Sequence, residues 1–168
     1  SVDFPILEYI VAIIMKITGI TSPWIFRKCT LLVALLGMFF LYKLSFLITE
    51  DWIKSLLVTM IAMTSPVYAY YFNGFIPGIP ALTFAIIALY CYVKYLNDSE
   101  IRTFCFSLLF ITLSVLTRMS FAVIWVALLG FEFLRILRKE STFLDKLLPV
   151  AISILVFLSY YLWNKHLA

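Results

Sequence analysis

The sequence is poor in charged residues and in the residue types that build soluble catalytic sites. Charged residues make up 13% of the 168 positions, against about 25% in a typical soluble domain. Histidine occurs once, at His166, which excludes a histidine-rich metal site within the chain. The three cysteines form no CxxC pair, so we expect buried free thiols. GxGxxG, Walker, HExxH and GxSxG motifs are all missing.

What the sequence has in excess is apolar residues, which make up 64% of it and lie in long unbroken runs. A soluble domain of this size could not cover that much apolar surface with polar groups. In lipid the backbone must be hydrogen-bonded internally, which leaves helices or a closed barrel, and a barrel would show short alternating segments. We therefore predict an all-α, polytopic transmembrane helix bundle. The basic residues make no stripe, so the net charge of +4 does not indicate nucleic-acid binding.

The first apolar segment, residues 5–18, is too short to cross a bilayer. Its 14 residues would extend over about 21 Å as a helix, against a hydrocarbon core of about 30 Å. Asp3 and Pro5 suit a helix start, and Gly19 suits its stop. We predict an interfacial juxtamembrane helix, with a core helix of the bundle as the alternative.

The rest of the chain predicts about six spanning helices. Residues 55–93 carry no charge and are too long for one span, and the Asn, Gly and Pro residues of 73–80 divide them. Pro66 should kink the helix before this division. The predicted spans cover residues 24–42, 52–72, 79–95, 101–117, 119–137 and 147–163.

Arg118 interrupts the longest late apolar run, and two interpretations compete. One long helix would hold Arg118 in mid-membrane, at a cost of about 2.5–3.5 kcal/mol, and would be far longer than a span needs. A tight hairpin instead puts Arg118 at a water boundary. We predict the hairpin.

These spans put eight basic residues, including Lys54 and Arg135, on one side and five, including Arg27 and Arg118, on the other. The more basic side is expected in the cytoplasm. Residues 1–20 then form an extracytoplasmic juxtamembrane segment and residues 24–163 the transmembrane helices of a single domain, 1–168. The chain starts without methionine and ends just after an apolar run. We expect a fragment of a longer multi-pass protein of the bacterial inner membrane.

Few polar side chains are placed where they could carry chemistry. Asp3 could be a general base or a ligand of a divalent cation for a membrane-borne phosphate substrate, or simply a helix cap. Arg27 and Arg118 could bind a lipid phosphate, or reach out to headgroups. Tyr71 and Asn73 lie in a turn region where aromatic rings either mark the membrane boundary or stack on sugars.

One further charged residue, Glu132, lies near the end of a predicted span. It is followed three positions later by Arg135. We predict a local ion pair between them, because residues at this spacing are neighbours on a helix.

Several short motifs resemble one family. Residues 3–19, beginning Asp-Phe-Pro, resemble the juxtamembrane segment of polyprenyl-phosphate-dependent glycosyltransferases of the GT-C superfold, which include protein O-mannosyltransferases and lipid A aminoarabinose transferases. Residues 24–27 resemble the aromatic-x-x-Arg opening of their next span. Residues 65–82 resemble their proline-rich stretch, and residues 116–118 their L-T-K-P turn. Gly78 stands where that stretch usually has aspartate, and Met119 where the turn usually has proline.

The resemblance implies transfer of a hexosyl or pentosyl group from a polyprenyl-phosphate donor to an acceptor at the extracytoplasmic face. Asp3 would match the family's second acidic position, which helps to bind metal or the donor phosphate, and Arg118 would meet the lipid phosphate. The principal catalytic aspartate of the family would precede Ser1. The alternatives are a transporter or flippase for lipid-linked sugars, without covalent chemistry, and a membrane scaffold. Polar residues at mid-membrane and broken helices in paired repeats would indicate a transporter, and the sequence shows neither.

Overall fold

The computed structural model describes residues 6–19, 23–72, 78–138, 150–158, 160 and 162. Within these ranges the regular structure is helical, with no strand, which confirms the predicted all-α class. The helices are α1 (Ile6–Thr18), α2 (Pro23–Thr49), α3 (Trp52–Thr64), α4 (Pro66–Phe72), α5 (Gly78–Asp98), α6 (Ile101–Thr117), the 3₁₀ turn η1 (Met119–Phe121), α7 (Ala122–Leu137) and a helix over residues 150–158.

Among the described residues, three helices are long and apolar enough to cross a membrane: Trp24–Thr49, Gly78–Asp98 and Met119–Leu137. α3 and α6 are apolar but shorter. The predicted count of six spans therefore stays a prediction. The predicted end of the first span at residue 42 is wrong, because α2 continues to Thr49. Lys43 lies inside this helix. Its ammonium is 4.9 Å from the ring centroid of Phe39, and its long aliphatic stem can lie along the apolar surface of the helix.

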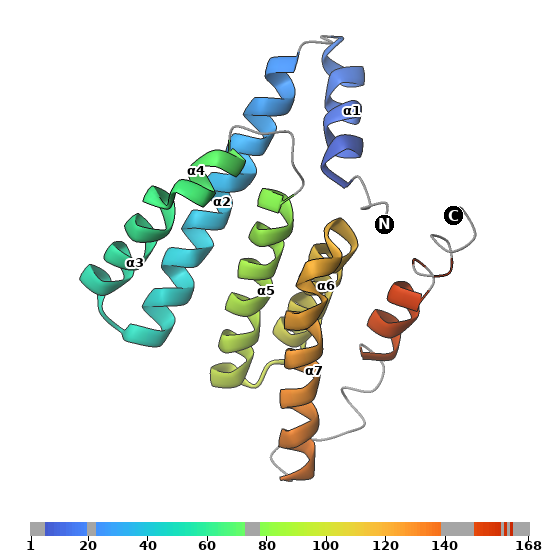
Figure 1. Ribbon diagram of the computed structural model, residues 1–168. Helices are drawn as coiled ribbons and strands as arrows, with labels where there is room; N and C mark the ends of the chain where they lie inside the picture. Colours follow the sequence, from blue (N-terminus) through green and yellow to red (C-terminus); the bar gives the residue numbers. More distant parts are fainter. Residues whose placement is uncertain are drawn as a thin grey trace.

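The helices are antiparallel neighbours with two distinct ends (Figure 1). One end, which we call the Arg118 end, carries the junction of α1 with α2, the start of α5 and the turn between α6 and α7. The opposite end, which we call the Arg138 end, carries the α2–α3 and α5–α6 turns and the end of α7. For the basic residues of the described helices, this arrangement agrees with the predicted sorting into two groups, and Lys139, Lys146 and Lys165 lie outside the described residues.

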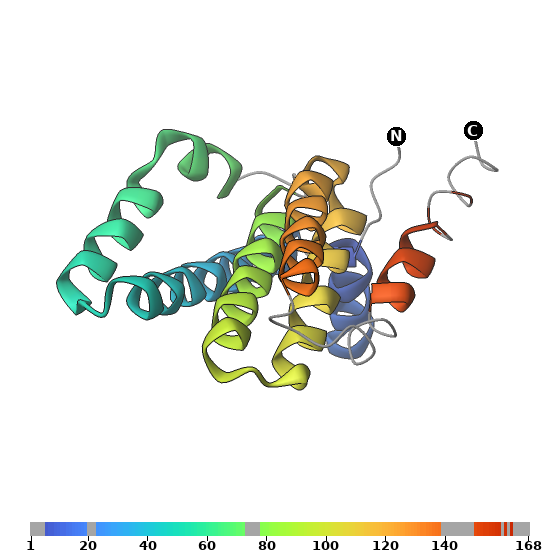
Figure 2. The same ribbon diagram turned by 90° about the horizontal axis from the view of Figure 1, so that it is seen from below.

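The core lies between α5 and α6, which form the most extensive helix pair. Phe104 and Ile111 of α6 are fully buried there, and the ring of Phe104 lies 5.1 Å from that of Tyr95. α3 lies at the edge of the bundle, beside α2 (Figure 2), and only Ser55 of its residues is buried. Most of its apolar side chains are exposed, as suits a surface that faces lipid.

All three cysteines are free thiols, as predicted, but the prediction that they are buried is wrong. Cys29 and Cys91 are half-buried and Cys105 is exposed. A thiol behaves as a small apolar group, so exposure on a lipid-facing helix carries no penalty.

Small hydroxyl side chains bring α5 and α6 together. The Ser107 hydroxyl donates to the carbonyl of Ala88 at 2.9 Å, and the Ser114 hydroxyl donates to that of Ala81 at 2.7 Å. Both serines are buried. Because lipid provides no hydrophobic drive between helices, small residues and hydrogen bonds of this kind are what hold such helices in contact.

The predicted hairpin at Arg118 is confirmed. α6 ends at Thr117, and Arg118 is its C-cap, with an extended backbone and an N–H that donates to the carbonyl of Ser114 at 2.9 Å. The predicted kink at Pro66 is also confirmed, as a full break between α3 and α4 at Ser65. Proline lacks the N–H that would continue the helix, and the Ser65 N–H turns back to the carbonyl of Ala62.

The α2–α3 turn is built from a strained residue and a cap. Glu50 has φ 53°, in the left-handed region that ends many helices. Asp51 follows as the N-cap of α3, and its carboxylate accepts from the N–H of Ile53 at 2.9 Å. This hydrogen bond is the main cause that lowers the pKa of the Asp51 carboxyl. Glu50 and Asp51 therefore define the conformation of the turn, which places α3 beside α2.

α2 and α5 cross closely at Gly37 of α2. A Cβ atom there would lie 2.6 Å from the Thr83 hydroxyl of α5, and that hydroxyl donates to the carbonyl of Val33 at 3.1 Å. We expect Gly37→Ala to lower the free energy of unfolding by about 1–3 kcal/mol, because overpacking forces the helices apart. The free energy of unfolding is measured by titrating the protein with SDS in a mild detergent.

Gly130→Ala is the matched control. Nothing lies within 4 Å of a Cβ atom at Gly130, so this change should be neutral or should stabilise α7 by up to about 1 kcal/mol through helix propensity. Thr83→Ala should recover part of the loss in the Gly37→Ala background. Equal stability of the two glycine variants would contradict the close crossing.

Candidate functional site

A cavity of about 480 Å³ lies between α2, the α3–α4 break, α5 and η1. Its walls are mostly apolar, and its polar side chains belong to Arg118, Tyr68 and Ser65. We call it the Arg118 cavity. It is lined by Met38, Leu41, Ala62, Ser65, Tyr68, Gly78, Ile79, Leu82, Ile86, Arg118 and Phe121.

Arg118 supplies the charge of this cavity. It is half-buried, and among the described residues the structure gives it no salt bridge. Its backbone is held by the turn between α6 and η1, through the N–H bond to Ser114. A guanidinium beside an apolar hollow suits a ligand that joins an anionic oxygen group to a hydrocarbon, because arginine binds such oxygens in a forked geometry.

The helix break places two more polar groups in the same cavity. Ser65 is the residue of the break, and Tyr68 lies in the first turn of α4. The Tyr68 hydroxyl donates to the carbonyl of Ala34 on α2 at 3.2 Å. Tyr68 is not among the site residues predicted from the sequence. The only signal in the sequence was Pro66, which predicted that the helix changes direction after α3.

The predicted site residues are brought together only in part. Arg118 lines the cavity, whereas Arg27 does not. Arg27 is exposed near the start of α2, with its guanidinium carbon 5.7 Å from the ring centroid of Trp24. Such a contact suits the end of a span, because tryptophan and arginine are both common at membrane boundaries. The predictions for Asp3, for Asn73 and for the side chain of Tyr71 lie outside the described residues.

A ligand set for a metal is not found within the described part of the chain. No group of three or more His, Cys, Asp or Glu side chains comes together there. The divalent cation expected at Asp3 stays a prediction, because Asp3 lies outside the described residues.

A second polar cluster lies toward the Arg138 end. Glu132 of α7 is only 3% exposed, and its Oε1 accepts from the Tyr92 hydroxyl at 2.8 Å and from Arg135 Nη1 at 3.0 Å. The predicted pair of Glu132 with Arg135 is confirmed. Tyr92 comes from α5, forty residues away in the sequence, so spacing along one helix could not reveal it.

Comparison with known families agrees with the fold and the motifs. The family model for dolichyl-phosphate-mannose-protein mannosyltransferases matches residues 4–163. The chain belongs to this family. It is therefore a membrane glycosyltransferase by family, as the resemblance had predicted. Searches of curated proteins and of solved structures returned no significant match.

The Glu132 cluster gives a prediction about stability. Tyr92→Phe should lower the free energy of unfolding by about 1–2 kcal/mol, because a buried carboxylate loses one of its hydrogen bonds while keeping Arg135. Tyr90→Phe, two positions away on α5, is the matched control, since the structure gives the Tyr90 hydroxyl no hydrogen bond among the described residues. Unfolding in SDS mixtures measures both, and equal losses would show that the Tyr92 bond adds nothing.

Proposed function

We propose that the chain takes part in transfer of a sugar from a polyprenyl-phosphate donor to an acceptor at the extracytoplasmic face, and that the Arg118 cavity receives the donor. The placement of Arg118 at the rim of an apolar cavity carries this proposal. The donor is itself a phosphate joined to a long hydrocarbon, so both halves of the molecule meet matching surfaces. Family membership supports the reaction class.

The transfer forms one bond and breaks another at the anomeric carbon of the sugar. The acceptor oxygen attacks that carbon while the bond to the donor phosphate oxygen breaks, and the phosphate leaves with the electron pair of that bond. The acceptor proton passes to a base, for which we propose Asp3. The Arg118 guanidinium stabilises the negative charge that develops on the leaving phosphate.

The cavity also explains how a donor that cannot leave the membrane reaches its site. The α6–α7 turn ends the apolar helices, so its backbone lies at the predicted extracytoplasmic boundary. The phosphate stays at that depth while the first hydrocarbon units enter between α2 and α5. The donor sugar then faces water, where the acceptor arrives. The bacterial inner membrane stays a prediction.

Arg118→Ala should lower kcat/KM for the polyprenyl-phosphate donor by about 10- to 100-fold, the loss of one charge-assisted phosphate contact. Arg118→Lys should retain part of the activity, because the charge stays and the forked geometry is lost. Radiolabelled sugar transfer by the full-length protein in liposomes measures these rates.

Arg102→Ala is the control for the loss of a positive charge. Arg102 is exposed at the first turn of α6, at the opposite end from Arg118, and should leave the donor kinetics unchanged. If Arg118→Ala and Arg102→Ala had the same kinetics, the donor phosphate would not bind at Arg118.

Asp3→Ala tests the base. Removing a general base typically lowers the rate by about 10²–10⁴-fold, so transfer should fall into this range, with the donor KM changed less than kcat. Asp3→Asn, which keeps a capping oxygen, separates the two predicted roles. Full activity of Asp3→Asn together with loss in Asp3→Ala would assign Asp3 to helix capping.

The alternative of a transporter or flippase makes the opposite prediction. Sealed vesicles loaded with labelled donor should then show movement of the intact lipid across the membrane without any product. Under the proposed function, the glycosylated acceptor forms and its amount accounts for the donor consumed.

A further inference from the structure

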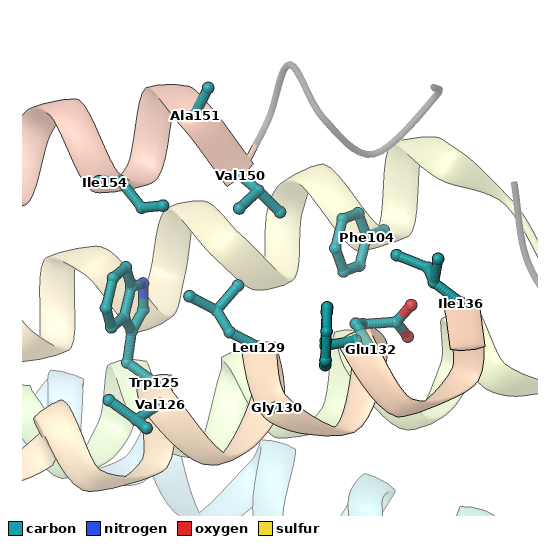
Figure 3. Close-up of a pocket in the computed structure, with 11 residues that line it drawn as sticks. Phe104, Trp125, Val126, Leu129, Gly130, Glu132, Ile136, Val150, Ala151 and Ile154 are labelled. Atoms are coloured by element: carbon teal, nitrogen blue, oxygen red, sulfur yellow. The ribbon is translucent and has the colours of Figure 1, made fainter. Parts of the chain in front are cut away.

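A larger cavity, of about 710 Å³, lies between α7 and the helix over residues 150–158, with α6 behind it (Figure 3). We call it the α7 groove. Its α7 wall includes Trp125, Leu129, Gly130 and Ile136, and its opposite wall includes Val150 and Ile154. It shares no lining residue with the Arg118 cavity, so it is a separate place in the fold.

The chemistry of the groove suits hydrocarbon. Its lining is apolar apart from Glu132 and the indole N–H of Trp125, and neither offers a free polar group. Glu132 is held by Tyr92 and Arg135, and Trp125 Nε1 donates to the Ser153 hydroxyl at 2.8 Å. Figure 3 shows the Glu132 side chain beside Phe104 and Ile136 rather than in open space. A dry apolar cavity takes apolar ligands in preference to water.

The length and depth of the groove match one leaflet. From Trp125 to Ile136 the helix rises eleven steps, about 16 Å, and half of a hydrocarbon core is about 15 Å. Ile136 is one residue from the end of α7 at Leu137. The groove therefore extends from the Arg138 end to about the membrane centre, which is the depth of one acyl chain.

The charges at this end favour an anionic headgroup. Arg135 lies in the last turn of α7 and Arg138 is its C-cap. Arg135 is paired with Glu132, whereas Arg138 is exposed. A donor held at Arg118 would have its phosphate at the opposite end of α7, about 24 Å away for a helix of this length, so its headgroup could not use these arginines.

We propose that the α7 groove binds one acyl chain of an anionic phospholipid from the leaflet at the Arg138 end, with the lipid phosphate near Arg138. The bound chain fills the space between α7 and the 150–158 helix and so holds that helix against the bundle. This proposal does not rest on the transferase proposal, because it concerns another cavity and the other end of the molecule.

Quenching of tryptophan fluorescence by brominated lipid tests it. The full-length protein is placed in phosphatidylcholine nanodiscs that contain a small fraction of phosphatidylglycerol with brominated acyl chains. The emission of Trp125 is obtained as the difference between wild type and Trp125→Phe. We expect at least twofold stronger quenching of Trp125 than with the same fraction of brominated phosphatidylcholine.

Two variants test the chain slot and the headgroup contact separately. Gly130→Phe should abolish the excess quenching, because the open space at Gly130 lets the ring enter the groove without striking backbone. Ala127→Phe, at an exposed residue of α7 that does not line the groove, adds nearly the same bulk on another face and should leave quenching intact. Arg138→Gln leaves the groove intact and should make the two lipids quench equally.

Three outcomes would overturn the proposal. The first is equal quenching of the wild type by the two brominated lipids. The second is quenching unchanged by Gly130→Phe in a variant that unfolds at the wild-type SDS fraction. The third is displacement of the quencher by an equimolar amount of unbrominated polyprenyl phosphate, which would assign the groove to the donor tail. Loss of sugar transfer in Arg118→Ala bears on none of these, so the two proposals fail separately.

Discussion

The fold depends on hydrogen bonds from side-chain hydroxyls to backbone carbonyls where two helices cross closely. In lipid the apolar side chains gain little by meeting each other, so contact must come from tight packing and polar bonds. Thr83 bonds α5 to α2, and Ser107 and Ser114 bond α6 to α5. Each bond needs a backbone near enough to accept it, which is why Gly37 and Ala88 lie at the crossings.

The positions of the two cavities follow from these close crossings. Where α5 packs against α6, the core is filled by small residues and by the rings of Tyr92, Tyr95 and Phe104. The Arg118 cavity and the α7 groove lie outside this closely packed pair. α4 turns away after Ser65, and the Arg118 cavity forms beneath it. α7 and the 150–158 helix meet where Trp125 bonds to Ser153, and the α7 groove lies between the two helices.

The predictable part of the structure is the part dictated by single segments. Apolar runs gave the helices, Pro66 the break and Arg118 the hairpin, because each effect acts within a few residues and the cost of a charge in lipid is large. The end of α2 was misplaced, because a lysine on a long stem does not have to end a span. The prediction for the cysteines failed on burial, since an apolar run does not say which of its faces meets lipid.

The site was predictable only where one residue is decisive. Arg118 could be singled out because a single charged residue in an apolar run is costly inside the membrane and must therefore lie at a turn or serve a function. Tyr68 and Tyr92 could not, since each acquires its role from a partner on another helix, Ala34 and Glu132. A tyrosine in an apolar run has no distinguishing pattern, and the register between two helices is a property of their packing rather than of either sequence alone.

The backbone of Arg118 caps the C-terminus of α6, and its side chain lines the Arg118 cavity. These two roles are independent. The main-chain bond to Ser114 does not involve the guanidinium, so many residue types could cap the helix equally well. The side chain at position 118 can therefore change without a change in the α6–α7 turn. In a bundle of this kind, single substitutions at such a position can change the chemistry of the cavity while the helices keep their positions.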